Sequence, residues 1–217
     1  MSKPGLILLG AGGHARSCID VIEQQGKYQV VGLVGLPEEL HSQHLGYEVI
    51  ATDESLSQFA KTTPYALITA GQIQTAKIRM RLYHQAMLYG FEMPVIIASS
   101  AHVSRHASIG PGSIVMHGAI VNAGAKVGNN CIINCRALVE HDTVVEDHCH
   151  ISTGAILNGG VIVEAGSFIG SGCVVKEGLS IGKDCVVGIG LTVRHTLADS
   201  TFFDGQKKHE KTHHHHC

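Results

Sequence analysis

The chain has 217 residues, of which 26 are Gly, 5 are Phe, 5 are Tyr and none is Trp. Charged residues make up 16%, below the roughly 25% typical of soluble domains. The aliphatic content excludes intrinsic disorder, and the formal net charge of −2 argues against a nucleic-acid binder, which needs a basic face. With a mean hydropathy of +0.16, some surface is expected to be buried against other subunits.

The sequence also bears on location. No apolar run approaches the roughly 20 residues of a membrane span, and the apolar stretch near the N-terminus is too short for a secretory signal. The 7 cysteines form no regular framework of pairs and resemble small core residues of a reducing compartment. A cytoplasmic protein without a membrane partner is therefore expected. The run His213–His216 is set apart from the fold argument as a candidate purification remnant.

Residues 1–98 alternate between strand-like and helix-like patterns. Strands are predicted over 6–9, 28–34, 47–51, 65–70 and 92–97, and helices over 15–25, 54–61 and 75–89. This βαβ order predicts a Rossmann-like unit with a small parallel sheet and a ligand crevice at the carboxyl ends of its strands.

From residue 99 to 200 a different rule holds. Every sixth residue from Val103 to Val193 is aliphatic, and a second column four positions later is mostly Ala, Ser, Thr or Cys. A strict six-residue repeat predicts a parallel β-helix, with the aliphatic side chains pointing inward and the small ones at the corners. Three hexapeptides make one coil, so that residues eighteen apart lie above one another. Residues 201–217 are interpreted as a tail.

The segment Gly10–Ala15 joins a predicted strand to a predicted helix. Glycines there let a ligand approach the backbone, and the helix N-terminus offers amide donors to an anion. A dinucleotide site would also need an acid at the end of the second strand, where this chain has Val34 and Gly35, so NAD is rejected. A phosphate or sugar-nucleotide site remains, with a tight turn that binds nothing as the alternative.

Two histidines of the repeat region stand out. His141 lies between Glu140 and Asp142, and a neighbouring carboxylate can fix its tautomer and raise its basicity. His150 lies nine residues later, half a coil away, and therefore on another side of the prism. If both serve one site, two subunits must supply them, and three prisms around a threefold axis would close such contacts. The remaining histidines of the early repeats, His102, His106 and His117, are interpreted as solvated surface residues.

Two segments carry a family resemblance: Asn134-Cys-Arg-Ala-Leu-Val-Glu-His141 and Ile151-Ser-Thr-Gly-Ala-Ile-Leu-Asn-Gly159. Together with the Gly10–Ala15 turn, they resemble the NeuD/PglD family of bacterial sugar acetyltransferases. The resemblance covers residues 5 to about 200. It implies a Rossmann-like N-terminal domain, a left-handed β-helix, a homotrimer with active sites between subunits, and acetyl-CoA as co-substrate without a metal.

The resemblance also implies roles for individual residues. His141 would be the general base, and Asp142 would raise its basicity. Acetyl-CoA contacts are implied for His150, Gly159, Ser171 and Ile189, and sugar-nucleotide contacts for Gly12, Gly13, His14 and Gly71. The family often carries aspartates after the second strand, where this chain has Val34 and Gly35, so the identity of the nucleotide base is left open.

The leading hypothesis is N-acetylation of the 4-amino group of a nucleotide-linked 4-amino-4,6-dideoxy sugar, UDP-linked by expectation, for a surface glycan. The close alternative is O-acetylation of a sialic-acid-like sugar. A zinc lyase would need three ligands, such as His117, His141 and His148, whose spacings place no pair on one ladder. A non-catalytic sugar-nucleotide sensor is the remaining alternative, and replacement of His141 would then leave function intact.

Overall fold

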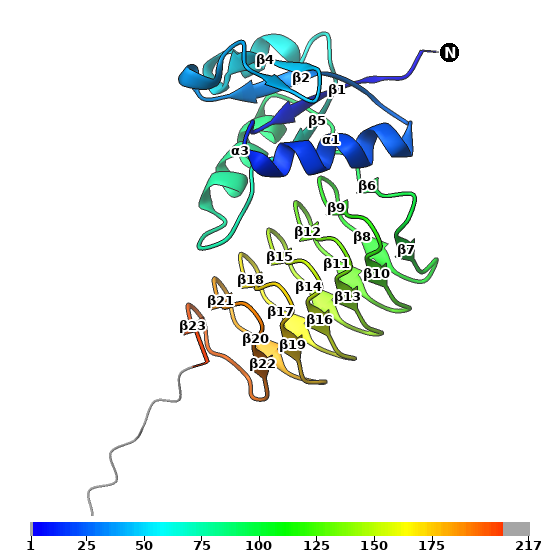
Figure 1. Ribbon diagram of the computed structural model, residues 1–217, viewed down its shortest axis with the longest axis vertical. Helices are drawn as coiled ribbons and strands as arrows, with labels where there is room; N and C mark the ends of the chain where they lie inside the picture. Colours follow the sequence, from blue (N-terminus) through cyan, green and yellow to red (C-terminus); the bar gives the residue numbers. More distant parts are fainter. Residues whose placement is uncertain (1, 206–217) are drawn as a thin grey trace, which may run out of the picture.

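The computed structural model describes residues 2–205. An N-terminal α/β unit lies along one side of a three-faced prism of short strands (Figure 1). The run His213–His216 lies outside the described residues.

The N-terminal unit has one sheet of five strands in the order β3-β4-β2-β1-β5. All neighbouring strands are parallel except β3 and β4. The strands are β1 (Gly5–Leu9), β2 (Gln29–Gly35), β3 (Gln43–His44), β4 (Tyr47–Thr52) and β5 (Tyr65–Ile68). The helices are α1 (Gly13–Gln25), α2 (Leu56–Phe59) and α3 (Lys77–Leu88), with short 3-10 turns η1 (Pro37–Glu39) and η2 (Asp53–Ser55). Strand β1, which lies between β2 and β5, is apolar and mostly buried, as the βαβ prediction requires.

One apolar face determines how helix α1 packs. Its buried residues Ala15, Cys18 and Ile22 recur at intervals of three or four, so they share one face. The helix ends at Gly26, whose left-handed backbone (φ 70°) lets its N–H donate to the carbonyl of Ile22. Figure 1 shows α1 between the sheet and the prism, and its apolar face packs in one cluster with prism residues such as Ile114.

The prism has three parallel sheets. The first contains β6 (Ile96–Ile97), β9 (Ile114–Val115), β12 (Ile132–Ile133), β15 (His150–Ile151), β18 (Phe168–Ile169), β21 (Val186–Val187) and β23 (Phe202–Phe203). The second contains β7 (His102–Val103), β10 (Ile120–Val121), β13 (Leu138–Val139), β16 (Ile156–Leu157), β19 (Val174–Val175) and β22 (Thr192–Val193). The third contains β8 (Ser108–Ile109), β11 (Lys126–Val127), β14 (Val144–Val145), β17 (Ile162–Val163) and β20 (Ser180–Ile181). We call them the covered face, the ladder face and the third face.

The six-residue rule is confirmed strand by strand. Each strand from β7 to β22 ends on one of the predicted aliphatic residues, and strands pair with a register of eighteen, as in Val121 with Val139. The second column is also found in the core, for example Ala119 and Cys149. The corners turn through left-handed backbone positions, taken by Gly in most coils and by residues such as Asn130, Asp142 and His148 in others.

Two sequence expectations need correction. Residues 92–97 do not form one strand of the N-terminal sheet, because Glu92 makes only an isolated bridge to Tyr65 while Ile96 and Ile97 form β6 of the prism. The segment expected as a tail begins with β23, which pairs with β21 and lengthens the covered face. Both errors arise because strand pairing over a long sequence separation leaves no local signal.

Candidate active site

The Gly10–Ala15 turn leaves the start of α1 open. Gly10 has φ 118°, and a β-carbon there would lie 2.5 Å from the backbone nitrogen of Ala70, so only Gly fits. Gly12 caps the helix without a side-chain bond, and a β-carbon at Gly12 or Gly13 would meet no atom within 4 Å. The space beside the first turn of the helix is therefore open, as anion binding at a helix N-terminus requires.

A pocket of about 290 Å³ lies beside this turn. It is lined by Gly10, Ala11, Gly12, Val34, Gly35, Leu36, Glu39, Asp53, Ala70, Gly71, Ile78, Arg81 and Leu82. Two carboxylates line the pocket, although β2 itself supplies none. Asp53 pairs with the Arg81 guanidinium at 2.9 Å, and Glu39 accepts the Leu36 N–H at 2.8 Å. The pocket is thus lined both by glycine backbone and by charged side chains.

His14 lies in the first turn of α1 against Gly71. A β-carbon at Gly71 would be 3.7 Å from that of His14, so the two predicted sugar-nucleotide residues are neighbours. The Nε2 atom of His14 is buried and has no hydrogen-bond partner among the described residues. Burial, followed by the positive charge of Arg79 and by His150, lowers the pKa of His14 to about 3. The ring is therefore neutral at physiological pH.

His141 occupies an exposed corner between the ladder face and the third face. Its Nδ1 lies 3.0 Å from Oδ2 of Asp142, and its backbone N–H donates to Glu140 at 3.2 Å. The hydrogen bond to Asp142 is the main reason that the pKa of His141 is raised above its usual value. Because an ionised carboxylate only accepts, Nδ1 carries the proton in neutral His141 and Nε2 has the free lone pair.

The eighteen-residue register places Gly159 directly beside this lone pair. A β-carbon at Gly159 would lie 2.6 Å from Nε2 of His141 and 2.7 Å from Cε1. The backbone pairs in the same place, since the Gly160 N–H donates to the His141 carbonyl at 3.0 Å. Glycine at position 159 therefore leaves room for the His141 ring. His141 and Gly159 are neighbours, as the sequence predicted.

His150 lies on the covered face, against the N-terminal unit. Its Nδ1 donates to the Gln72 carbonyl at 2.6 Å, and its Nε2 accepts from the Asn134 amide at 3.0 Å. Its ring packs on Phe168 with centroids 5.2 Å apart. Burial lowers the pKa of His150 to about 4, so the ring is a neutral, fully paired group. Its implied contact with acetyl-CoA remains a prediction.

Ser171 and Ile189 belong to a third corner, between the covered face and the ladder face. The predicted stack is present, because the Gly172 N–H donates to Thr153 and the Gly190 N–H to Ser171, at 2.9 and 2.8 Å. Ser171 also meets Ser152 at 2.9 Å, while the Ile189 side chain is 75% exposed. The corner is exposed at Thr153 and Ile189 and partly exposed at Ser171.

The predicted site residues thus fall into three groups. His14, Gly71 and His150 gather where the N-terminal unit meets the prism, His141 and Gly159 share one corner, and Ser171 and Ile189 share another. The side-chain hydrogen bond of His141 goes to Asp142 in its own loop.

Sequence reasoning missed Gln72, Asn134 and Arg79, which pack at the meeting of the two parts. One signal existed for Arg79, because it stands in the buried stripe of α3 with Leu82, Tyr83 and Ala86.

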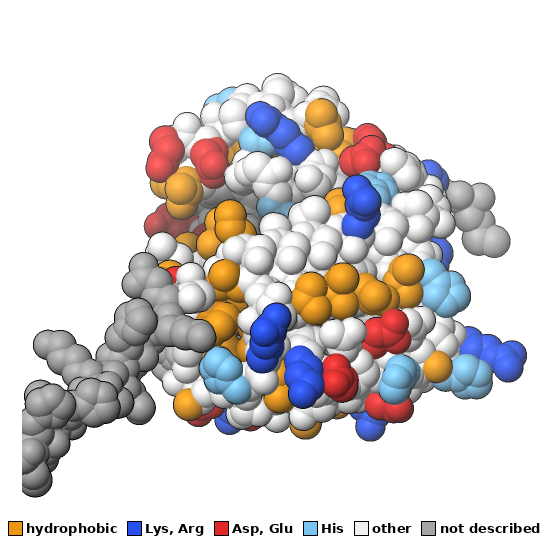
Figure 2. Space-filling view, turned by 60° about the horizontal axis from the view of Figure 1, so that its bottom comes forward, with side chains coloured by type: hydrophobic (Ala, Val, Ile, Leu, Met, Phe, Trp, Pro, Cys, Tyr) orange, Lys and Arg blue, Asp and Glu red, His pale blue; other side chains and the backbone are white. Residues whose placement is uncertain are grey.

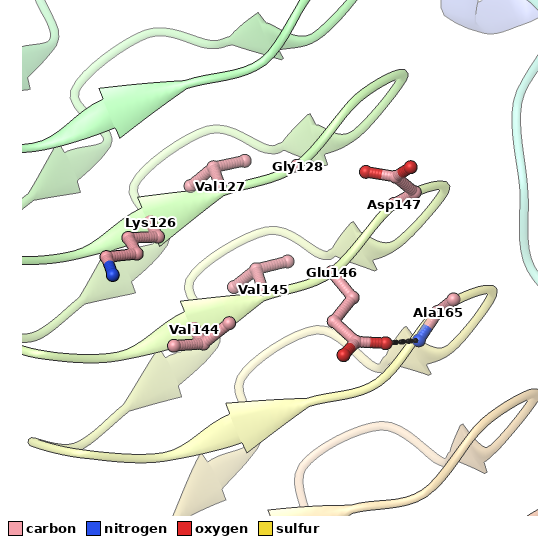
Figure 3. Close-up of a pocket in the computed structure, with 8 residues that line it drawn as sticks. All are labelled: Lys126, Val127, Gly128, Val144, Val145, Glu146, Asp147 and Ala165. Carbon is pink, nitrogen blue, oxygen red and sulfur yellow. Dashed lines mark hydrogen bonds between the residues drawn. The ribbon is translucent and has the colours of Figure 1, made fainter.

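A second hollow, of about 390 Å³, lies on the third face between β11 and β14 (Figure 3). Figure 3 shows the carboxylate of Glu146 bonded to the N–H of Ala165, at 3.1 Å. Asp147 likewise accepts the N–H of Asn129 at 2.7 Å. Both acids hold turns of the coil, and none of the predicted site residues lines this hollow.

The histidines weighed for a zinc site are held apart by other partners. His117 has a side chain that is 29% exposed, so it stays partly solvated, and it also links the two parts of the chain by meeting Asp20 of α1 at 2.8 Å. His148 accepts from Asn130 at 3.0 Å. Within residues 2–205, no three His, Cys, Asp or Glu side chains are grouped as a metal site.

In the same residues, no helix combines the length and the apolar character of a membrane span.

Known proteins resemble this chain over nearly its whole length. The family model of the PglD N-terminal domain matches residues 5–86. Perosamine N-acetyltransferase from Caulobacter crescentus, solved with CoA and GDP-perosamine, is 31% identical with a TM-score of 0.85, covering 92% of each chain. The acetyltransferase domain of PglB from Neisseria gonorrhoeae is 29% identical with a TM-score of 0.83, covering 91% of this chain and 95% of that one. No curated protein sequence matches the chain.

WeeI from Acinetobacter baumannii shares the fold at 22% identity, with a TM-score of 0.78 over 90% of this chain and 94% of that one. The predicted fold class, a Rossmann-like α/β unit followed by a left-handed β-helix, is confirmed. The chain belongs to the NeuD/PglD-type family of sugar acetyltransferases, enzymes that take their acetyl group from acetyl-CoA.

Proposed function

We propose that the protein acetylates the 4-amino group of a nucleotide-linked 4-amino-4,6-dideoxy sugar for a surface glycan, with His141 as the general base. The observation that carries this proposal is the pair of His141 and Asp142, joined at 3.0 Å, with the free Nε2 packed beside the backbone of Gly159. The two relatives near 30% identity are described as an N-acetyltransferase and an acetyltransferase domain.

The chemistry is a direct transfer. Nε2 of His141 takes a proton from the attacking amine while the amine nitrogen bonds to the thioester carbonyl carbon. The carbon–sulfur bond then breaks, and the proton passes from the imidazolium to the leaving CoA thiolate. Asp142 stabilises the transient positive charge on the ring. Five of the six thiols among the described residues are buried, and burial raises the pKa of thiols such as Cys149, so these five are poorly suited as nucleophiles.

The proposed active site lies between subunits of a trimer. Three facts support this arrangement: His141 and the group of His14 and His150 lie at different edges of one chain, the corner of Ser171 and Ile189 is exposed at Ile189, and the ladder face is apolar. From β10 to β19 its outward residues are Ile120, Leu138, Ile156 and Val174, while the end strands β7 and β22 contribute His102 and Thr192. Figure 2 shows a row of hydrophobic side chains along the underside of the prism. A second copy on this face would bring a His141 toward the neighbour's sugar site.

The sugar nucleotide would place its phosphates at Gly12 and Gly13 and its sugar toward His14 and Gly71. We expect the base beside the charged side chains of the pocket, Asp53 and Arg81. The sequence favoured a UDP-linked sugar, while the Caulobacter relative is described with GDP-perosamine. Val34 and Gly35 supply no carboxylate at the end of β2, so both nucleotides belong in the test.

Release of CoA is the decisive measurement, with UDP- and GDP-linked 4-amino sugars and a free sialic acid as acceptors. Turnover of an amino sugar nucleotide is expected. Turnover with sialic acid alone would contradict the proposal. Replacing His141 by Ala should lower kcat by about two to four orders of magnitude. A sensor would instead bind the nucleotide sugar with the same affinity in both forms and release no CoA.

A further inference from the structure

Arg79 is a wholly buried cation at the meeting of the two parts of the chain. One terminal nitrogen of its guanidinium donates to the carbonyls of Ile68 and Ala70, at 2.9 and 2.7 Å. The other donates to the carbonyl of Asn130 at 3.1 Å and to its side-chain oxygen at 2.7 Å. The planar fork of this one side chain therefore joins the end of β5 to a corner of the prism.

Asn130 completes the connection from the prism. Its side-chain nitrogen donates back to the Arg79 carbonyl at 3.3 Å and to Nδ1 of His148 at 3.0 Å. Asn130 is itself fully buried and has φ 52°, at a corner position that Gly112 and Gly166 take in other coils. We call the pair of Arg79 and Asn130 the clasp.

The clasp grips the backbone that forms the sugar-nucleotide pocket. Between the two carbonyls bound by Arg79 lies Thr69, whose hydroxyl donates to the Gly10 carbonyl at 2.6 Å. Ala70 and Gly71 line the pocket. A displacement of this segment relative to the prism would move the sugar with it.

Gln72 adds a second link immediately after this segment. Its side chain donates to the Gly166 carbonyl at 3.2 Å, and its own carbonyl accepts from His150 at 2.6 Å. The stretch from Ile68 to Gln72 is thus fixed to two coils of the prism by polar contacts.

If the clasp served only to pack the two parts of the chain together, a buried arginine would be an unfavourable residue for it. Among residues 2–205, no carboxylate pairs with Arg79, and its Nε has no partner. A buried charge without a counter-ion costs free energy, and an apolar side chain of similar volume would usually stabilise such a site as well or better. The hydrogen bonds of Arg79 are directional and reach four oxygens on two parts of the chain. They therefore fix the position of one part relative to the other, which an apolar side chain would not do.

We propose that Arg79 is a positioning residue that, through Asn130, holds the sugar-binding segment in register with the prism on which acetyl-CoA binds. The inference rests on the proposed function, since it concerns the alignment of the acceptor amine with the thioester. A misplacement of about 1 Å in such an alignment can cost about a hundredfold in rate. Acetyl-CoA is expected along the corner of Ser171 and Ile189, which carries none of the four oxygens that Arg79 binds.

The test variant is Asn130→Gly, because Gly takes the same backbone conformation at Gly112 and the coil should keep its shape. The matched control is Asp184→Gly, an exposed residue with φ 52° at the same corner of the prism. Each protein is assayed for the Kd of acetyl-CoA, and for kcat and KM with the best sugar nucleotide, with rates expressed per bound acetyl-CoA. Arg79→Lys and Arg79→Met are measured in the same way.

For Asn130→Gly we expect a kcat at least tenfold lower, with the acetyl-CoA Kd within twofold of the parent and the control unchanged. Arg79→Lys should keep more activity than Arg79→Met, because it retains the charge but not the fork. A kcat within twofold of the parent for Asn130→Gly would overturn the proposal. So would a loss of acetyl-CoA sites that accounts for the whole fall in rate, since the clasp would then only stabilise the fold.

Should the parent protein acetylate no amino sugar nucleotide, the proposed function fails and the clasp is judged on amide exchange. Exchange over residues 69–76 should then be faster in Asn130→Gly than in Asp184→Gly. Equal amide exchange rates in the two variants would contradict the proposed role of the clasp as well.

Discussion

Nε2 of His141 lies so close to the backbone of Gly159 that a single methyl group at 159 would come within 2.6 Å of it. One coil below His141, Ala123 occupies the same position of the repeat, so the coil itself accepts a side chain there. The demand for glycine at 159 therefore comes from the imidazole.

Gly159→Ala should displace the His141 ring and lower kcat by about ten- to a hundredfold while the fold is kept. Steady-state kinetics measure the loss. In the His141→Ala background the same substitution should change the residual rate by less than twofold, because the ring it displaces is absent. Equal effects in both backgrounds would show that Gly159 acts independently of His141.

Asp142 should control the pH dependence of the reaction. The base must be neutral to accept a proton, so kcat/KM rises with pH through the pKa of His141, which the bond to Asp142 raises. In Asp142→Asn this raising is lost, and the acid limb of the profile should move to lower pH with a plateau about ten- to a hundredfold lower. Asn keeps the left-handed backbone at this corner.

The matched control for this prediction is Asp184→Asn, since Asp184 is exposed and has a similar φ of 52° far from His141. Its pH–rate profile should coincide with that of the parent. A profile of Asp142→Asn that also coincides with the parent would contradict the assigned role of Asp142.

His150 should make the fold sensitive to acid. It is neutral in the folded protein, with its pKa lowered to about 4, whereas the unfolded chain takes up the proton below about 6.5. The unfolded state thus binds more protons between about pH 6.5 and 4, so the free energy of unfolding falls as the pH falls through this window. The slope from one such group is up to about 1.4 kcal/mol per pH unit.

Denaturant unfolding at several pH values measures this slope. His150→Gln should flatten it, whereas His195→Gln, at an exposed position after β22, should leave it unchanged. An unchanged slope in His150→Gln would mean that its burial is not maintained in solution. His14, with a pKa of about 3, adds a second contribution of the same sign.

The parts of this structure that sequence could predict follow from local periodicity. The repeat sets each inward residue and also the register, so the contact of His141 with Gly159 followed from counting eighteen. The environment of His150 could not be predicted, because its partner Gln72 is 78 positions away and belongs to another packing unit. The buried charge of Arg79 was hidden for the same reason, since three of its four acceptors are backbone carbonyls, which any sequence provides.

The ladder face offers the sharpest test of the assembly. Ile120 points outward from that face and Ile162 outward from the third face, and both are 39% exposed. Ile120→Lys should convert a trimer to monomers, because a charge placed in an apolar interface is buried without a partner. Ile162→Lys carries the same change at equal exposure and should leave the trimer intact. Light scattering measures the mass of each form.

Activity should follow assembly in these two variants, because His141 of one chain and the sugar site of its neighbour come together only in the trimer that we propose. Ile120→Lys should therefore lose acetyl transfer about as completely as His141→Ala, while each chain remains folded by circular dichroism. A monomeric Ile120→Lys that keeps the parent kcat would place the whole site within one chain. If only Ile162→Lys dissociated the trimer, the interface would lie on the third face. The subunit that approaches His141 would then be the one packed on that face.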